Sequence, residues 1–413
     1  MRQLPSCLLL LPVLPEELIL EILFRVPVRF LKRFMCVCKS WKTLISSSQF
    51  EKEHFRTSFS VTSMTHQRLV TLTNDDWKSI TTCSMRSLFE DLLVPPKTVS
   101  LRVEPRWVYI IGSCNGLLCL SDDFGLFKLR NPFTGSASKR SPTIDVMWRT
   151  ISQYGFGYDQ VNDKYKVLIT SNGETKVHTF GTNYWTTIQT FPSALPPECW
   201  DKVGQFVSGA LNWLVLERDR IISFDLEKET YGEVLLPHNM DGDLPCNHVL
   251  HVLNNCLCLC YFTDIHCVVW LMKKYGIQES WTKMMLIPHY KIPVRNNNAS
   301  FRVRPLCISE NGVVLLETNE NQLVMYDTKN GEVYYPSKIF GTYRVDIHIY
   351  HESYAPELAP KVRKGCRSNG CKNPPVGKFG YCDFHRSKSQ ARQRKRAAKR
   401  RKLEDTAHPA AIE

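Results

Sequence analysis

The recurrence of short strand-like runs between residues 100 and 354 constrains the fold of this chain more than any other feature. A turn of small residues followed by an apolar run occurs as "NGLLCL" at Asn115, "GALNWLVL" at Gly209, "NNCLCLCYF" at Asn254 and "NGVVLLE" at Asn311. A second run that ends in a turn follows as "LFKLRNPFTG", "IISFDLEKE" and "LVMYDTKNGE". Short β-branched and aromatic runs between turn residues are typical of strands joined in hairpins. We therefore expect a mainly-β domain here.

A third recurrence indicates the length of the repeating unit. The runs "WTTIQTFP" at Trp185 and "WTKMMLIP" at Trp281 begin 96 residues apart, which is about two units of 45–50 residues. Units of that length built from short strands are typical of β-propeller blades. About 255 residues would hold five or six blades. The alternative is an irregular β-sandwich without radial symmetry.

The β-rich region shows no sequence motif of a catalytic site. The phosphate-cradling glycine loop, the HExxH zinc motif and the nucleophile elbow are all absent from the sequence. Gly155 and Gly157 form a lone glycine pair, which we interpret as a blade turn rather than a nucleotide site. We therefore predict that the domain is not an enzyme.

Isolated cysteines and histidines in this region are interpreted as packing residues. Cys256, Cys258 and Cys260 alternate, so they share one face of a strand, about 6.6 Å apart in succession. That spacing is too wide for all three to reach one zinc ion. His248 and His251 are expected to be loop or core residues rather than a ligand pair.

The segment from Leu14 to Ile45 has the periodicity of three short helices. Pro15 suits the start of the first helix, and an apolar stripe with i, i+4 spacing follows it up to the stop at Pro27. A second helix is expected at about 29–35 and a third from Lys39. Three such helices cannot bury a good core alone in about forty residues. This unit therefore either caps the next domain or binds a partner.

The same segment resembles an F-box. The resemblance rests on the Leu14–Pro15 pair, the helix that ends at Val26–Pro27, and "VCKSW" at 37–41. It implies docking on a Skp-family adaptor and, through it, on a cullin scaffold, because apolar helix residues act as anchors in a partner's groove. The positions that match the family's adaptor-binding pattern are Leu14, Pro15, Leu18, Ile22, Leu23, Val26, Pro27, Leu31, Cys38 and Trp41.

The β-rich region is similar to the F-box-associated domain of plant F-box/kelch-repeat proteins. The similarity rests on "GSCNGLLCL", "LRNPFTG", "YGFGYDQVNDKYKVL" and "VSGALNWLV", which occur in this order. It implies a module that recruits a target protein. Loops on such folds carry the function, and the candidate loops are 238–248 and 289–298.

The positive charge of the chain is concentrated at its end. Residues 361–413 hold 16 Lys and Arg against 4 Asp and Glu, and thus +12 of the net +13. A proline-containing linker at 352–364 precedes a C-x4-C-x10-C-x2-H pattern. Thiolate and imidazole ligands in this spacing suit one tetrahedral structural zinc ion. The predicted ligands are Cys366, Cys371, Cys382 and His385; the alternative is that they are unligated residues of a disordered tail.

A dense basic run follows the predicted zinc hairpin. Such runs act in nuclear import or contact nucleic-acid phosphates, and we favour import with at most weak nucleic-acid affinity. The expected locations are the nucleus, the cytoplasm or both. The residues concerned are Arg392, Arg394, Lys395, Arg396, Lys399, Arg400, Arg401 and Lys402.

The sequence thus predicts an α+β multidomain chain. Its parts are a three-helix F-box (10–55), a mainly-β, β-propeller-like domain (100–355), a short zinc-hairpin-like tail (361–390) and a disordered basic end (391–413). The predicted function is that of a non-catalytic substrate receptor in a Skp–cullin–F-box ubiquitin ligase. The alternative is a nuclear nucleic-acid-binding protein that acts through the tail. No membrane association is expected, because no run reaches the ~18 apolar residues of a spanning helix.

Overall fold

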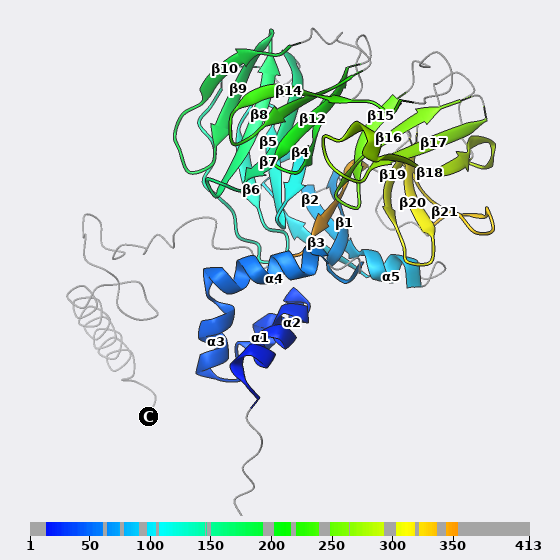
Figure 1. Ribbon diagram of the computed structural model, residues 1–413. Helices are drawn as coiled ribbons and strands as arrows, with labels where there is room; N and C mark the ends of the chain where they lie inside the picture. Colours follow the sequence, from blue (N-terminus) through cyan, green and yellow to red (C-terminus); the bar gives the residue numbers. More distant parts are fainter. Residues whose placement is uncertain are drawn as a thin grey trace, which may run out of the picture. The chain divides into compact units, whose positions relative to one another are not determined.

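The computed structural model describes most of the chain up to residue 353 (Figure 1). All of these residues belong to the first of two units, Met1–Leu358 and Ala359–Glu413. The described ranges are 14–60, 64–74, 78–90, 97–104, 107–144, 146, 150–192, 202–215, 220–238, 248–263, 265–292, 303–318, 322–336 and 344–353.

The amino-terminal part is helical. Helices α1 (Glu16–Arg25), α2 (Val28–Phe34) and α3 (Lys39–Ile45) lie where three helices were predicted, and α4 (Ser48–Ser60) follows as a fourth. Pro15 and Pro27 stand at the start of α1 and α2 with φ of −53° and −56°, values that suit a helix beginning.

A small core holds these helices together. Leu23, Leu31, Ile45 and Phe50, one from each helix, are at most 2% exposed. Phe24 of α1 stacks on Phe50 of α4 with ring centroids 5.0 Å apart. The fourth helix therefore supplies apolar cover that three short helices lack, which is why the helical unit extends past the predicted boundary.

The rest of the described chain is mainly β. It also contains the short helix α5 (Met85–Glu90) and the 3-10 turns η1 (Met64–His66), η4 (Gln278–Ser280) and η5 (His289–Lys291). The strands are β1 (Gln67–Asn74), β2 (Lys78–Ser84), β3 (Thr98–Arg102), β4 (Trp107–Cys114), β5 (Leu117–Asp122), β6 (Phe127–Arg130), β7 (Ile151–Asp159), β8 (Lys164–Ser171), β9 (Glu174–Thr179), β10 (Thr186–Thr190), β11 (Val203–Val207), β12 (Ala210–Val215), β13 (Arg220–Asp225), β14 (Thr230–Leu235), β15 (His248–Leu253), β16 (Cys256–Phe262), β17 (His266–Met272), β18 (Trp281–Pro288), β19 (Val303–Ile308), β20 (Val313–Thr318), β21 (Leu323–Asp327), β22 (Val333–Tyr334) and β23 (Arg344–His351).

These strands form antiparallel units of three or four, arranged as in a β-propeller (Figure 1). Within the described ranges the units are β23-β1-β2-β3, β4-β5-β6, β7 to β10, β11 to β14, β15 to β18 and β19 to β22. A short parallel pairing of β7 with β11 joins two of them into one eight-stranded sheet. The mainly-β, propeller-like prediction is confirmed.

The predicted turn-then-strand repeats are the hairpins between the first two strands of the units. Asn115 and Gly116 have φ of 49° and 76°, and Ser208 and Gly209 have φ of 51° and 83°. Two consecutive positive φ values are the geometry of a tight primed hairpin turn, which Asn and Gly adopt at low cost. The small-residue signal in the sequence therefore has a direct backbone cause.

The β domain begins earlier than the predicted residue 100. Strands β1 to β3 span 67–102, and β1 pairs antiparallel with β23 from Gln67–His351 to Thr73–Arg344. One unit thus combines strands from both ends of the domain, which closes the ring and leaves its first and last strands paired. A pairing between strands this far apart leaves no local sequence pattern.

The glycine pair at 155 and 157 lies within strand β7, so the interpretation as a blade turn was wrong. A Cβ on Gly157 would meet the Phe206 ring at 2.4 Å, and one on Gly155 would meet Leu211 at 2.9 Å. The glycines therefore allow the β11–β12 hairpin to pack closely against β7. By contrast, the interpretation of Cys258 and Cys260 as core residues is confirmed, since both are fully buried on β16.

Candidate functional site: an exposed apolar stripe on the helical domain

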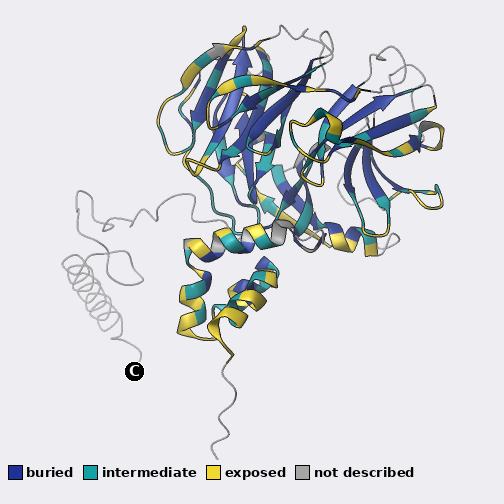
Figure 2. Ribbon diagram, viewed as in Figure 1, coloured by how far each residue is buried: buried dark blue, intermediate teal, exposed yellow. Residues whose placement is uncertain are grey.

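Helix α1 carries apolar side chains on two sides, and only one side is covered. Leu14, Leu18 and Ile22 follow one another at i, i+4 spacing and are 51%, 45% and 50% exposed. The side that carries Leu23 packs into the helical core. A helix that is apolar on both sides is normally covered on both. We call Leu14, Leu18 and Ile22 the apolar stripe (Figure 2, where α1 shows exposed residues).

The turn between α2 and α3 exposes a further apolar residue. Val37 is 62% exposed, and Cys38 beside it is exposed as well. Val37 was not among the predicted adaptor-binding positions, although it belongs to the "VCKSW" motif. Val37 is a candidate contact residue because it is exposed. The sequence could not predict this exposure, because the predicted second helix ends at residue 35.

The structure divides the ten predicted adaptor-binding residues by burial. Leu23 and Leu31 are fully buried, so they shape the helical unit and offer no surface to a partner in this conformation. Val26, Pro27 and Trp41 are partly buried. The ones that offer exposed surface are Leu14, Pro15, Leu18, Ile22 and Cys38.

Cys38 orients the start of α3. Its Sγ accepts a hydrogen bond from the Trp41 backbone N–H at 3.4 Å and lies 3.0 Å from Ser40 Oγ. The Ser40 hydrogen bond, with the Trp41 N–H second, lowers the pKa of the Cys38 thiol. The residue therefore acts as the helix cap, the role that a side-chain acceptor plays for free N–H groups. Trp41, so placed, packs edge-on against Phe34 at 5.7 Å.

Basic residues lie on α2 and α3. Between residues 26 and 47 there is no Asp or Glu. A partner that covers this region with acidic side chains would gain favourable long-range attraction and faster association. The five basic residues are Arg29, Lys32, Arg33, Lys39 and Lys42.

The helical unit also contacts the β domain through α2 and α4. Lys52 Nζ lies 2.8 Å from Asp163 Oδ2, and Lys32 Nζ lies 4.8 Å from the centre of the Phe133 ring. The His54 ring of α4 meets that of His66 in η1 edge-on at 5.8 Å. Within the helical unit, His54 Nε2 also donates to the Val26 carbonyl at 2.8 Å. These contacts leave the apolar stripe uncovered.

Histidines at this junction are held neutral. Burial lowers the pKa of His54. Burial, followed by the nearby His54 and Arg29, lowers the pKa of His66 to about 4. A neutral pair is the expected state where two buried imidazoles lie close together and near the charge of a guanidinium.

The remaining predicted sites lie mostly outside the described residues. This holds for the zinc ligands Cys366, Cys371, Cys382 and His385, for the basic run 392–402, and for most of the candidate loops at 239–247 and 293–298. Within the ranges that are described, no three His, Cys, Asp or Glu residues gather as a metal site, and no helix has the length and apolarity to cross a membrane.

Comparison with known proteins identifies both parts of the chain. Residues 11–53 match the F-box domain, and residues 78–360 match the F-box associated beta propeller domain. An F-box/kelch-repeat protein of Arabidopsis thaliana is 31% identical over 78% of this chain and 90% of its own length. Another F-box protein of that plant is 29% identical over 77% of this chain and 86% of its own length.

The F-box protein CPR1 of Arabidopsis thaliana is 28% identical over 86% of this chain and 90% of its own length. The family resemblance read from the motifs is thereby confirmed. The chain belongs to the F-box proteins that carry an F-box-associated β-propeller domain.

Proposed function

We propose that this protein is the substrate-recognition subunit of a Skp–cullin–F-box ubiquitin ligase. An F-box domain implies an adaptor of the Skp type as its partner. The observation that carries the proposal is the apolar stripe of Leu14, Leu18 and Ile22, which the rest of the described chain leaves exposed. Covering these side chains removes apolar surface from water, which favours binding in proportion to the area buried.

The stripe supplies part of the free energy of docking. Full burial of an exposed aliphatic side chain contributes roughly 1.5–3 kcal/mol. The three stripe residues are already about half covered, so each would contribute about 1 kcal/mol on docking. The stripe and Val37 are therefore anchors, and the basic residues from Arg29 to Lys42 steer an acidic partner toward them.

The β domain would hold the target protein. Loops on a rigid scaffold are the usual binding elements of such folds. A target held there lies close to the ligase's transfer machinery, and tethering raises its effective concentration without any chemistry by this chain. The proposed role is accordingly non-catalytic.

The adaptor contact is tested by replacing Leu18 and Ile22 together with Ala. Loss of about 2 kcal/mol of apolar contact is expected to weaken binding to a Skp-family adaptor roughly thirtyfold. Isothermal titration of the purified adaptor into the full chain measures this change.

The matched control is Leu235→Ala, which removes a leucine of similar exposure, 53%, from β14. Its adaptor affinity should equal that of the unaltered chain. An unaltered chain that binds no Skp-family adaptor contradicts the proposal, and so does a double variant that binds as tightly as the control.

For the tail we propose one structural zinc ion and nuclear import. The C-x4-C-x10-C-x2-H spacing and the concentration of +12 net charge in residues 361–413 support this. The alternative is that the tail binds nucleic acid, which its positive charge favours. Such binding would weaken steeply as the salt concentration rises.

Zinc content tests the first half of the tail proposal. The intact protein should carry one zinc per chain by elemental analysis, and Cys366→Ser with Cys382→Ser should carry none, because loss of two thiolates breaks a four-ligand site. The control is Cys36→Ser, an exposed cysteine outside the motif. Absence of zinc from the intact chain would contradict the proposed metal site.

A further inference from the structure

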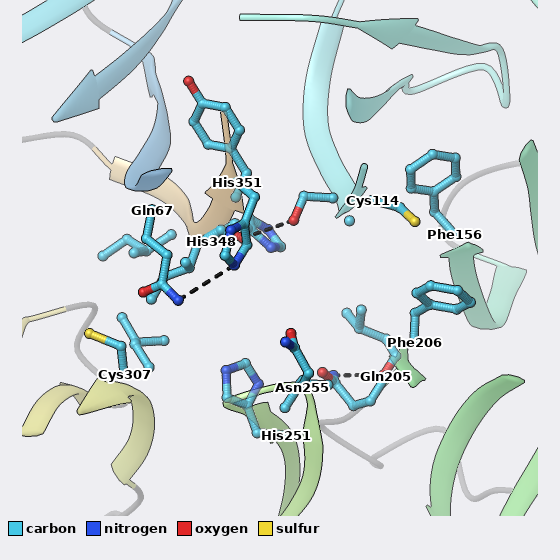
Figure 3. A pocket seen from close by; sticks show the side chains of 18 of the residues that line it. Gln67, Cys114, Phe156, Gln205, Phe206, His251, Asn255, Cys307, His348 and His351 are labelled. Carbon is cyan, nitrogen blue, oxygen red and sulfur yellow. Dashed lines mark hydrogen bonds between the residues drawn. The ribbon is translucent and has the colours of Figure 1, made fainter. Parts of the chain in front are cut away.

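A cavity of about 230 Å³ lies among the inner strands of the β domain. Its walls come from β1, β4, β7, β11, β15, β19 and β23, and so from every one of the described units (Figure 3). A single water molecule needs only about 10–15 Å³ of such space. The cavity therefore has room for a small organic molecule, and adaptor docking on α1 makes no use of it.

The cavity has a polar side and an aromatic side. Figure 3 shows Gln67, His348 and His351 on one side, His251, Asn255 and Gln205 below them, and Phe156 and Phe206 across the space. Pockets that combine apolar surface with a few convergent polar groups are the usual form of small-molecule sites.

The charge at the cavity is a compensated ion pair. Among the described lining residues Arg304 is the permanently charged one, and none of them is Asp or Glu. Glu317, 5% exposed, accepts from Arg304 Nε at 2.9 Å and fixes the guanidinium in place. Glu317 offsets the Arg304 charge, so an anion in this space would meet N–H donors of the guanidinium and of an imidazole rather than a net positive charge.

Two imidazoles lie in the field of Arg304. Burial and then the Arg304 charge lower the pKa of His251 well below its usual value, and the pKa of His348 to about 3. His348 donates a hydrogen bond to the Ile110 carbonyl, whereas His251 Nδ1 is buried and has no hydrogen-bond partner within the described chain. A buried polar atom without a partner costs free energy, and a ligand that pairs with it recovers that cost.

We propose that this cavity binds a small organic carboxylate. Its carboxylate group would accept hydrogen bonds from His251 and the Arg304 guanidinium, and its apolar body would lie against Phe156 and Phe206. A metal ion is disfavoured, because the described residues offer no cluster of three or more metal-ligating side chains.

The imidazoles of His251 and His348 are both neutral in the unliganded chain, and a carboxylate bound to His251 raises the pKa of that imidazole. Binding that takes up a proton at His251 should therefore strengthen as the pH falls from 7.5 to 6. The thiols and the phenol that face them stay neutral, since burial raises their pKa values. The titratable and charged groups around the two histidines are Arg304 with Glu317, His351 with His66, Cys114, Cys307 and Tyr350.

The experiment is isothermal titration of the full-length chain with sodium benzoate, with benzamide as the neutral isostere, and with inorganic phosphate. Benzoate should bind saturably, benzamide at least about tenfold more weakly, because it lacks the charge-assisted hydrogen bonds. Inorganic phosphate should bind more weakly than benzoate because it has no apolar body to place against the two phenyl rings.

The decisive variant is His251→Gln, which keeps a polar side chain but removes the imidazole. It should weaken benzoate binding about tenfold or more and abolish the gain at pH 6. The matched control is His238→Gln, an exposed histidine outside the cavity, which should bind as the unaltered chain does.

Three results would overturn the proposal: no saturable benzoate binding at either pH, equal affinity for benzoate and benzamide, or equal affinity of the two variants. If phosphate binds more tightly than benzoate, the site takes an anion without an organic body and the carboxylate assignment is wrong. The comparison of benzoate with benzamide uses the unaltered chain, so it decides the matter even if a variant does not fold.

Discussion

At the scale of single residues, the buried Lys166 is the side chain on which two neighbouring units depend. Its Nζ lies 3.0 Å from Asp159 Oδ2 and 2.9 Å from Glu229 Oε1, and it donates to the Leu226 carbonyl at 2.5 Å. Asp159 is only 1% exposed. Removal of one partner leaves the other charge buried, so Lys166→Met should destabilise the protein by about 3–5 kcal/mol. Urea unfolding followed by circular dichroism measures the loss.

The comparison variant for Lys166 is Lys176→Met. Lys176 pairs at 3.7 Å with Glu174, whose side chain is 64% exposed. Such a surface pair contributes at most about 1 kcal/mol, so this variant should unfold near the midpoint of the unaltered chain. Equal midpoints for the two variants would show that the Lys166 network does not hold the units together.

At the scale of elements, the contact between α4 and η1 makes stability depend on pH. The folded pKa of His66 is about 4, against an ordinary value of 6.5. The unfolded chain therefore takes up a proton that the folded chain refuses, so stability is present above pH 6.5 and falls as the pH drops toward 4. The loss from His66 alone is up to roughly 3 kcal/mol. The measurement is the free energy of unfolding at pH 7 and at pH 4.5.

Other buried histidines, His54 among them, add to the same fall. The variant His66→Gln isolates the contribution of His66: its free energy of unfolding should fall clearly less between pH 7 and pH 4.5. The control His238→Gln replaces an exposed histidine and should lose as much stability as the unaltered chain. If the stability of the His66→Gln chain falls as much as that of the unaltered chain, His66 is not the cause of the pH dependence.

At the scale of the whole molecule, closure of the ring depends on β23. This strand pairs with β1 along 344–351, and Ile347 and Tyr350 of β23 are 2% exposed. A chain that ends at residue 343 would leave β1 unpaired on one side and lose these buried side chains. We expect it to be degraded rapidly in limited proteolysis, whereas a chain that ends at residue 353 retains the pairing and should resist. Equal resistance of the two chains would mean that closure contributes little stability.

Much of the fold was readable from local pattern. Hairpin turns such as Asn115–Gly116 depend on the backbone freedom of two adjacent residues, so their sequence signal survives in any context. The helix starts at Pro15 and Pro27 are equally local. The fourth helix and the strands at 67–102 were missed, because each is stabilised by residues distant in the chain: α4 by the core of α1 to α3, and β1 by β23.

The sequence alone therefore determined the two kinds of structure, their order and the residues that compose the F-box, since periodicity and turn chemistry are properties of short segments. Tertiary structure decided which of those residues are available. Leu18 and Leu23 both fit the helical pattern, yet one is 45% exposed and the other is fully buried. Only the ring places His251 of β15 and His348 of β23 at one cavity. The physical reason is that burial and convergence are set by contacts between distant segments, which no local repeat encodes.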